Sequence, residues 1–590
     1  MRKTKLNTSI SSLCVFLILL AMTGQNLQAQ QRHMENIDRG VVAVPDDQGN
    51  AFISWRLLGN EPVDLAFNVY RTVASNQPEK LNKSPITDVT YFVDEALPLD
   101  EPDVSYFVRS IINGKEREPS SRYKVNPDQP YISVGVNVPE GYTSNDASVG
   151  DLDGDGQYEL VVHMTGRAHD NSHSGFTDEP ILDAYELDGT QLWRINLGKN
   201  IREGAHYTQF IVYDLDSDGK AEVACKTADG TVDGEGNVIG DPDADHRNDE
   251  GYILKGPEFL TIFDGETGGE LTTTDYIPPR HPDTLNPTSE QLDELWGDGY
   301  GNRMDRFLAG VAYLDGEKPS LIMARGYYTR SVIAAWNWRD GELKNIWTFD
   351  TDEGYPEYAG QGNHSLSVGD VDGDQKDEII YGSAVIDHDG TGVHTTGIGH
   401  GDALHYGNLD PTHPGQEIFH IQERFDDAGA NFRAAESGDI LWKKPSVSAS
   451  DEGEGPGRGL AANIDPRYTG AEMWVRGGGI EGLFNAKGEK ISDHKPQSCN
   501  FAIWWDGDLQ RELLNSNRIT KWNWKNEQTE LLLEAEGSTS NNGTKSTPTL
   551  SADLFGDWRE EVIWRAERGG RAPNLYNHYS HGASHAHLDA

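Results

Sequence analysis

The sequence predicts an all-β protein, in which a β-propeller follows a small N-terminal β-sandwich. Two interleaved repeats predict the propeller: an acidic loop that leads into a short apolar strand, and a pair of strand-like segments around a glycine-containing turn. Loop, strand and hairpin together make a small antiparallel sheet, which is the unit of a propeller blade. Residues 34–130 have a different sequence pattern, and this pattern predicts the sandwich.

The acidic loop occurs six times. Clear copies read DLDGDGQYEL from Asp151, DLDSDGKAEV from Asp214 and DVDGDQKDEI from Asp370, and looser copies begin at Asn408, Asn463 and Asp553. Carboxylates at positions 1, 3 and 5 of a tight loop can converge on one hard cation, and so many oxygen ligands favour calcium. An EF-hand would place its Glu at position 12 between helices, whereas here the Glu stands at position 9 before an apolar strand-like run.

The loops therefore predict several bound Ca²⁺ ions, with a backbone carbonyl from position 7 and the Glu carboxylate from position 9. The alternative is that Asp and Gly simply form turns. Three near-identical copies disfavour that alternative, while the looser copies leave it open. The predicted ligands are Asp151, Asp153, Asp155, Gln157, Glu159, Asp214, Asp216, Asp218, Lys220, Glu222, Asp370, Asp372, Asp374, Lys376 and Glu378 in the clear loops, and Asn408, Asp410, Glu417, Asn463, Asp465, Glu472, Asp553, Asp557 and Glu561 in the looser ones.

The second repeat supplies the hairpins. It reads LDAYELDGTQLW from Leu182, LTIFDGETGGEL from Leu260 and IAAWNWRDGELK from Ile333, and it returns from Phe432 and Gly482. Each copy is two strand-like segments around a turn. The spacing between acidic loops is irregular, which indicates degenerate blades such as VAYLDGEKPSLIMARG from Val311.

The N-terminus has the layout of a secretory signal peptide. MRKTK precedes the apolar run LCVFLILLAM and a small-residue site at Ala29, so we expect removal of residues 1–29 and a secreted or periplasmic protein. No later run is long and apolar enough for a membrane helix, so we expect no membrane span. Cys225 and Cys499 remain after cleavage, and we expect both to be buried free thiols.

The formal net charge of −46 argues against a nucleic-acid partner. Losing Arg2, Lys3 and Lys5 with the signal peptide takes the charge to −49. Bound divalent cations would balance part of it, and an anionic ligand would need a locally basic or metal-bearing cleft. We expect a monomer.

Residues 34–130 alternate in the manner of strands, as in AFISW, AFNVYR, TYFVD and VSYFVRSI, between turns rich in Pro, Asn and Gly. This pattern predicts a small β-sandwich of fibronectin type III character, with a packing or spacing role. The propeller would then occupy residues 131–565.

Four polar, Gly-containing stretches look like site loops: GQGNH ending at His364, GHGDALH from Gly399, GPGRG around Arg458 and SNNGTK ending at Lys545. Ligand sites of propellers lie where loops from several blades meet, so these stretches are expected to converge. His364, His400 and Glu423 form either a mixed metal site or satisfied structural polar groups. Arg458 and Lys545, each taken alone, would more often be solvated surface charges.

Several long strings carry a family resemblance. They are NIDRGVVAV from Asn36, GAHYTQFIVYDLDSDGKAEVACKTADGTVDG from Gly204, AGQGNHSLSVGDVDGD from Ala359, GIGHGDALHYGNLDP from Gly397, NFAIWWDGDLQRELL from Asn500 and SNNGTKSTPTLSADLFGDWREEVIWR from Ser540. In order, from about residue 36 to residue 565, they resemble the rhamnogalacturonan lyases of polysaccharide lyase family 11.

The resemblance implies a secreted, calcium-rich bacterial enzyme with an eight-bladed propeller. It implies β-elimination in the rhamnogalacturonan I backbone of pectin, at the bond from rhamnose to O4 of galacturonate, with endo action favoured. By matching motif, Arg458 and Lys545 would share the base and charge-stabilising roles. His364, His400, Asp402 and Glu423 would form a metal and ligand cluster, and the sugar contacts would include His364, Asn145, Asn542, Gly543 and Thr544.

The last residues depart from that family. Residues 566–590 are rich in histidine and lack strand alternation, so we expect an incomplete last blade with exposed sheet edges. A frameshift near codon 566 explains such a tail, and it predicts apolar strand segments in another reading frame of the gene.

Two other functions fit part of the sequence. A calcium-loaded propeller that binds glycans or proteins without catalysis explains the acidic loops but not the NNGTK and GQGNH runs. A quinone-dependent dehydrogenase propeller would need a cofactor-binding set of residues, and no convincing set is present.

Overall fold

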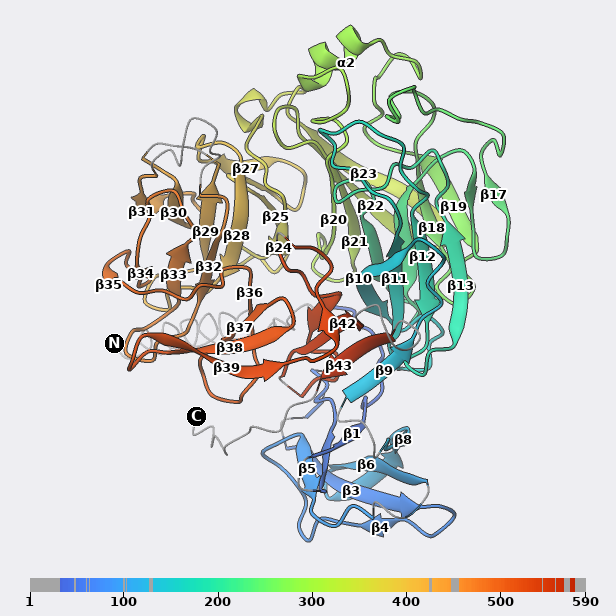
Figure 1. Cartoon of the computed structure of the whole chain (residues 1–590), viewed down its shortest axis with the longest axis vertical. Coiled ribbons are helices and arrows are strands. Elements are labelled where there is room, and N and C mark those ends of the chain that lie inside the picture. Colours follow the sequence, from blue (N-terminus) through green and yellow to red (C-terminus); the bar gives the residue numbers. More distant parts are fainter. Residues whose placement is uncertain are drawn as a thin grey trace, which may run out of the picture.

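The structure is a computed structural model, and the residues that it describes form β-strands and loops with very little helix (Figure 1). Its helical elements, within the described residues, are α2 (Ser289–Trp296) and the short 3-10 helix η1 (Pro356–Tyr358). The prediction of an all-β protein is thus confirmed. The structure describes residues 32–46, 49–59, 61–62, 64–98, 101, 103–126, 131–423, 427–446, 456–543, 545–557, 559–566 and 574–578, and the predicted signal peptide lies outside them.

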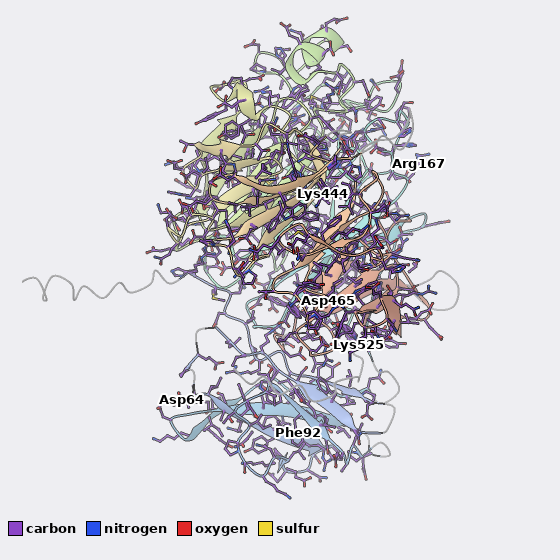
Figure 2. All side chains as sticks on the ribbon, turned by 90° about the vertical axis from the view of Figure 1, so that its left-hand side faces the viewer. Asp64, Phe92, Arg167, Lys444, Asp465 and Lys525 are labelled. Atoms are coloured by element: carbon purple, nitrogen blue, oxygen red, sulfur yellow. The ribbon has the colours of Figure 1, made fainter. Side chains whose placement is uncertain are left out.

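The N-terminal domain consists of two antiparallel sheets that share one core. Ala43, Ile53 and Trp55 from one sheet pack with Val69 and Tyr106 from the other. Figure 2 places Asp64 and Phe92 in this domain, apart from the larger one. The first sheet holds β1 (Val42–Pro45), β2 (Ala51–Ser54) and β5 (Tyr91–Asp94), and the second holds β3 (Ala66–Val73), β4 (Glu79–Lys80), β6 (Val104–Ile112), β7 (Lys115–Pro119) and β8 (Tyr123–Lys124).

Eight further antiparallel sheets follow in the described part of the chain, and we number them in chain order. Sheet 1 holds β10 (Thr143–Gly150), β11 (Glu159–Thr165), β12 (Ile181–Tyr185), β13 (Gln191–Asn196), β16 (Thr231–Val232) and β17 (Val238–Ile239). Sheet 2 holds β14 (Phe210–Tyr213), β15 (Glu222–Thr227), β18 (Phe259–Phe263) and β19 (Glu270–Asp275). Sheet 3 holds β20 (Phe307–Ala312), β21 (Ser320–Arg325), β22 (Val332–Arg339) and β23 (Glu342–Asp350).

The next three sheets have four strands each. Sheet 4 holds β24 (Ser367–Gly369), β25 (Glu378–Tyr381), β26 (Ala384–Ile386) and β27 (Gly392–Thr395). Sheet 5 holds β28 (Gly401–Gly407), β29 (Glu417–Gln422), β30 (Ala430–Ala434) and β31 (Ile440–Lys444). Sheet 6 holds β32 (Gly459–Ala462), β33 (Glu472–Val475), β34 (Leu483–Phe484) and β35 (Lys490–Ser492).

The last two sheets complete the set. Sheet 7 holds β36 (Phe501–Ile503), β37 (Glu512–Asn515), β38 (Arg518–Asn523) and β39 (Gln528–Glu534). Sheet 8 holds β40 (Ser538–Thr539), β41 (Leu550–Ala552), β42 (Glu561–Ala566), β43 (Asn574–His578) and β9 (Tyr131–Gly135).

The burial pattern of a strand depends on its position within the sheet. The second strands, such as β15 and β21, are buried along their whole length, because other sheets cover both of their faces. An outer strand such as β23 alternates between exposed and half-buried residues, as expected where one face meets water.

Successive sheets pack face to face and return to their start. The core between sheets 1 and 2 contains Val161 and Val223, and equivalent cores lie between each later pair. A further core joins sheet 8 to sheet 1 through Ile563 and Leu160. The first strands also touch in order, from β10 through β14, β20, β24, β28 and β32 to β36, and β41 touches β10.

The C-terminal tail contributes a strand that the sequence analysis did not expect. β43 pairs with β42 on one side and with β9 on the other (Figure 1). One strand, at residues 574–578, thus lies in the tail whose sequence lacks strand alternation. Its physical origin is the free edge of β9, which offers backbone hydrogen bonds to any extended segment. The remaining tail lies outside the described residues.

Arg56 joins the N-terminal domain to both ends of the larger one. Its guanidinium donates to the carbonyl of Leu554, at 2.8 Å from Nη2, and to that of Gly156 at 3.4 Å. Its side chain also stacks on the ring of Tyr158 at 4.7 Å. The loops of sheets 8 and 1 are thereby held by one buried cation.

We expect Arg56→Met to destabilise the protein by about 2 kcal/mol, because it leaves the buried carbonyl of Leu554 without its donor, whereas the carbonyl of Gly156 still accepts from Asp38 N. Urea unfolding at saturating calcium measures the change, and Arg109→Met, at a half-buried position of β6, is the control. An unchanged unfolding midpoint for Arg56→Met would contradict the joining role.

The structure also bears on the two cysteines and on membrane-spanning helices. Cys225 and Cys499 are buried and unpaired, as expected. Within the described residues, no helix has the length and apolar character needed to cross a membrane.

Candidate active site and cation-binding loops

One cavity of about 780 Å³ collects side chains from several sheets. Several of its residues stand just before a first strand or just after a second strand: His206 precedes β14, Arg306 precedes β20, Arg458 precedes β32 and Glu423 follows β29. First and second strands are antiparallel, so these positions meet at the same edge of every sheet. The fold therefore gathers residues that lie far apart in the sequence.

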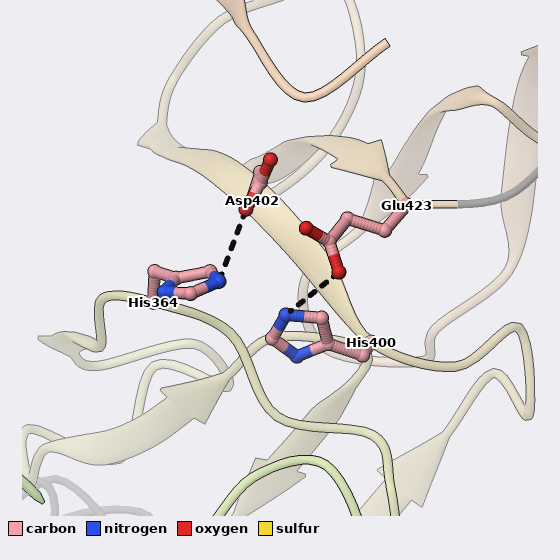
Figure 3. Close-up of side chains that lie close together, drawn as sticks. All are labelled: His364, His400, Asp402 and Glu423. Carbon is pink, nitrogen blue, oxygen red and sulfur yellow. Dashed lines mark ion pairs between the residues drawn. The ribbon is translucent and has the colours of Figure 1, made fainter. Parts of the chain in front are cut away.

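Two histidines and two carboxylates form a cluster at this edge (Figure 3). His364 Nε2 lies 3.1 Å from Asp402 Oδ1, and His400 Nε2 lies 3.5 Å from Glu423 Oε2. One candidate ligand atom from each residue lies within 4.8 Å of the others. The hydroxyl of Tyr327 lies 3.1 Å from His364 Nδ1, which fixes the ring. The four residues that the resemblance grouped are thus brought together.

The charge state of the cluster suits a metal site. Burial, together with the nearby His364, lowers the pKa of His400 to about 3, so its ring is neutral at neutral pH. Burial alone would raise the pKa of Asp402, but the hydrogen bond and charge of His364, with Lys545, hold it below its ordinary value. Neutral imidazole and ionised carboxylate are the forms that bind divalent cations.

Basic side chains share the same cavity. Arg458 and Lys545 both line it, and so do Arg306 and Arg476. Arg476 N donates to the carbonyl of Arg458 at 2.9 Å, so the backbone segments that carry these two arginines are hydrogen-bonded to each other. Arg306 lies over the ring of Tyr328 at 5.4 Å. In a chain with a net charge of −46, this is a local concentration of positive charge.

The predicted sugar-contact residues have different surroundings. Asn542 Oδ1 accepts from the backbone N–H of Lys545 at 2.8 Å, and it thereby shapes the turn that presents Lys545. Gly543 faces open space. Asn145 lies on β10 and donates to Thr165 Oγ1 at 2.9 Å. Thr544 lies outside the described residues.

The three clear acidic loops share one geometry. In the first, Asp151 accepts from the N–H groups of Gly154 and Gly156, and Glu159 Oε2 accepts from Leu152 N at 2.7 Å. The corresponding bonds recur in the other two loops, where Leu215 N donates to Glu222 and Val371 N donates to Glu378. Three-carboxylate groups able to hold an ion occur in all three: Asp151, Asp153 and Glu159; Asp214, Asp216 and Asp218; Asp370, Asp372 and Asp374.

Two of the loop glutamates have a buried oxygen without a hydrogen-bond donor in the described part of the chain, although His388 Nδ1 lies 3.7 Å from Glu378 Oε1. Glu159 Oε1 and Glu378 Oε1 accept no hydrogen bond from the described residues, although both side chains are about 1% exposed. Burial raises the pKa of Glu159, Glu222 and Glu378 to about 8. A buried carboxylate without a partner is costly unless a cation joins it, so the residues present fit bound calcium.

The side chains of the position-7 residues pair with nearby groups, and two of them reach the position-5 carboxylate of their own loop, since Lys376 Nζ lies 3.7 Å from Asp374 Oδ2. Gln157 donates to Asp155, Lys220 pairs with Glu266 at 2.6 Å, and Lys376 Nζ lies 2.8 Å from His388 Nε2. Their predicted role rests on their backbone carbonyls alone.

Side chains of the protein partly neutralise two of the looser loops. Lys487 Nζ lies 2.5 Å from Asp410 Oδ2, and His413 lies 2.8 Å from Glu417. In the next loop Arg467 pairs with Asp465 at 2.6 Å. Asn408 is exposed, Asn463 donates to the carbonyl of Leu509, and burial raises the pKa of Glu472 to about 8.

The loop of sheet 8 stays acidic. Glu561 Oε2 accepts from Leu554 N at 2.8 Å, as in the clear loops, and its Oε1 has no hydrogen-bond donor among the described residues. Burial raises the pKa of Glu561 and of Asp557. Asp553 accepts from Asp557 N at 3.2 Å, which closes the turn.

A seventh acidic loop escaped the sequence analysis. It reads WWDGDLQRE from Trp504 to Glu512, with acids at positions 3, 5 and 9 and tryptophan at position 1. Glu512 Oε2 accepts from Trp505 N at 2.9 Å, which is the bond seen in the other loops. The spacing of its three acids was the signal that would have found it.

Family models cover the whole of this architecture. The model described as "Rhamnogalacturonan lyase family 11, C-terminal domain" matches residues 126–581, and "Rhamnogalacturonan I lyases beta-sheet domain" matches residues 32–126. The chain belongs to rhamnogalacturonan lyase family 11. The family predicted from the motifs is confirmed.

Individual relatives of this lyase family are similar over nearly the full length. Rhamnogalacturonan endolyase YesW of Bacillus subtilis (strain 168) is 51% identical over 579 residues, which cover 96% of this chain and 88% of that protein. Rhamnogalacturonan exolyase YesX of the same strain is 51% identical over 570 residues, which cover 92% and 88%. The solved structure "Bacillus licheniformis Rhamnogalacturonan Lyase PL11" has a TM-score of 0.85 and 54% identity, and the match covers 93% of this chain and 91% of that one.

The sequence analysis missed several residues of the site of this family 11 chain. Asp170, His206, Arg306 and Arg476 line the cavity, and Tyr327 orients His364. Their common signal is placement next to a first or second strand. That placement is visible only once the strands of each sheet are assigned.

Proposed function

We propose that this chain is a secreted lyase that cleaves the rhamnogalacturonan I backbone by β-elimination at the rhamnose-(1→4)-galacturonate bond. Membership of family 11 supports this activity. The observation that carries it is the cavity in which Arg458 and Lys545 face the cluster of His364 and Asp402. A polyanionic substrate is repelled by most of an acidic surface, so a locally basic cavity accounts for its binding.

The basic pair supplies the two groups that elimination needs. A base must take the C5 proton of galacturonate, and a positive charge must stabilise the negative charge that develops beside the carboxylate. Arg458 and Lys545 divide these roles. The electron pair of the C5–H bond becomes the C4–C5 double bond, and the rhamnose-linked oxygen leaves from C4, so the new non-reducing end is unsaturated.

The histidine and carboxylate cluster would hold a divalent cation in the same cavity. His364, His400, Asp402 and Glu423 offer two nitrogen and two carboxylate ligands. When bound, such an ion supplies charge neutralisation at a uronate carboxylate. His364 then also lies where a sugar can reach it, since it lines the cavity.

We propose the finer architecture from the sheets. The cycle of face-to-face packing supports an eight-bladed β-propeller with calcium in its acidic loops. The two N-terminal sheets over one core support a fibronectin type III-like domain. Cleavage after Ala29, export and a monomeric state complete the proposal.

The direct test incubates the purified mature protein with rhamnogalacturonan I, first with calcium and then with chelator, and follows the absorbance near 235 nm. A calcium-dependent rise supports the lyase, since the product carries a conjugated unsaturated uronate. A folded, calcium-loaded protein that binds the polymer with no rise would instead support a non-catalytic glycan-binding propeller.

The same assay decides the mode of cleavage. YesW and YesX are each 51% identical to this chain, so sequence identity does not distinguish endo from exo action. We propose endo action, which predicts a sharp fall in viscosity while the absorbance rise is still small. Release of short products alone from the start would contradict it.

A further inference from the structure

The loop of sheet 7 has the backbone geometry of the cation-binding loops. Asp508 N donates to Asp506 Oδ1 at 3.2 Å, and Gln510 N donates to Asp508 Oδ1 at 2.8 Å. The same two bonds occur in sheet 1, from Asp155 N and Gln157 N, at 3.0 and 2.8 Å. The loops therefore present their position-3 and position-5 carboxylates in the same way.

A lysine ammonium lies among the carboxylates of the sheet 7 loop. Lys521 Nζ lies 2.7 Å from Asp508 Oδ2 and 2.8 Å from Glu512 Oε1, and it also donates to Asp506. One oxygen from each of positions 3, 5 and 9 thus binds the same nitrogen. The Lys521 side chain is only 18% exposed, so it is held in this place.

Strand register explains why lysine reaches that point. Leu513 pairs with Thr520, so the next residues along, Glu512 and Lys521, face each other. In sheet 1, Leu160 pairs with Tyr185, which brings Glu186 opposite Glu159. The registers of sheets 2 and 4 place an acid in the same way: Asp264 follows Phe263, and Asp387 follows Ile386.

In sheets 1, 2, 4 and 7 the position opposite the loop glutamate therefore adds a charge to the loop. Where it is acidic, as with Glu186, it adds to a cluster that already has an excess of carboxylates. In sheet 7 it is Lys521, and the position-1 carboxylate is replaced by Trp504. Calcium requires six to eight oxygen ligands, several of them anionic, and this loop has lost one ligand while gaining a cation.

We propose that Lys521 is a built-in counter-ion that replaces calcium in the loop of sheet 7, so that this sheet holds its structure without a metal ion. Calcium removal then affects the molecule unevenly. Sheets 1, 2 and 4 loosen at their acidic loops, while sheet 7 does not. The inference rests on the proposed binding of calcium in the acidic loops, and it is independent of the proposed lyase activity.

Hydrogen exchange of the full chain, with calcium and after chelation, tests this on the wild-type protein. Amides in residues 505–523 should change protection by less than about 2-fold, whereas those in residues 151–165 and 370–386 should lose about 10-fold or more. An equal loss in residues 505–523 would overturn the proposal.

Lys521→Glu tests the same idea in the opposite direction, because it recreates the acid of Glu186. Native mass spectrometry should find one additional calcium ion per chain, and residues 505–523 should become sensitive to chelator. Lys525→Glu, an exposed lysine of the same sheet (Figure 2), is the matched control and should gain no ion. A folded Lys521→Glu protein with no added ion and no chelator sensitivity would refute the proposal. If that variant does not fold, the wild-type exchange result decides.

Discussion

Lys545→Ala is expected to reduce kcat/KM on rhamnogalacturonan I by about 10³-fold, since a positioned proton-transfer or charge-stabilising group contributes about 10² to 10⁴. Lys545 lines the cavity with Arg458, and its charge acts on Asp402. The measurement is the initial rate of absorbance increase near 235 nm at saturating calcium. Lys525→Ala, outside the cavity, should keep the wild-type rate.

The folded state of the Lys545→Ala protein must be checked separately. Lys545 stands in a turn closed by Asn542, whose bond is to the Lys545 backbone, so alanine preserves it. An unchanged unfolding midpoint together with the rate loss supports a role in the reaction. A loss of less than about 5-fold would leave Lys545 outside the reaction, because that is below the range for a positioned acid, base or charge.

Arg458→Lys separates the two roles. The ordinary pKa of lysine lies about 2 to 3 units below that of arginine, so if Arg458 is the base, the rising limb of the pH profile of kcat/KM moves to lower pH. If Lys545 is the base, the limb stays in place and the rate falls through poorer carboxylate binding. A lysine lacks the planar fork that grips a carboxylate with two hydrogen bonds.

The sequence analysis predicted those parts of the site whose residues lie within one short segment of the chain. His364, His400 and Lys545 each stand in a polar run that blade strands do not require, and the structure brings them to one edge. The acidic loops were equally visible, because Asp151, Asp153 and Glu159 act within one nine-residue span.

The residues that the sequence analysis missed are brought together only by pairing between strands. Arg306 and His206 enter the cavity only because β20 and β14 begin at the same edge as β32. Lys521 stands nine residues after Glu512, and only the register of β37 and β38 brings its ammonium into the loop. Lys487 reaches Asp410 from 77 residues away. β43 likewise needs the edge of β9, from the other end of the chain.

Calcium removal is expected to destabilise the protein progressively as pH rises from about 5 to about 8. Burial raises the pKa of Glu159, Glu222, Glu378 and Glu472 to about 8 in the absence of a cation. The pKa of an unfolded-state glutamate is about 4.3. Between these values the folded state binds more protons than the unfolded state, so stability is full below about pH 4 and is lost as pH rises through about 8.

The size of the effect can be bounded. Discounting each shift to one pKa unit for residual solvent screening gives about 1.4 kcal/mol per glutamate, or roughly 5 kcal/mol for the set. At about 1 °C per kcal/mol for a chain of this size, Tm of the metal-free protein should fall by about 5 °C over that pH range. Calcium-loaded protein should show little of this fall, because the ion compensates the ionised carboxylates.

The experiment strips the metal at pH 8, removes the chelator by gel filtration and then measures Tm at each pH, because chelators bind calcium weakly in acid. Glu159→Gln is the matched variant, since the amide keeps the shape and carries no charge. Its metal-free Tm should depend less steeply on pH, while its calcium-loaded form should be less stable than the wild type. A metal-free wild-type Tm that stays level or rises between pH 5 and pH 8 would mean that these glutamates carry no uncompensated charge, and calcium would then have to stabilise the fold through other groups.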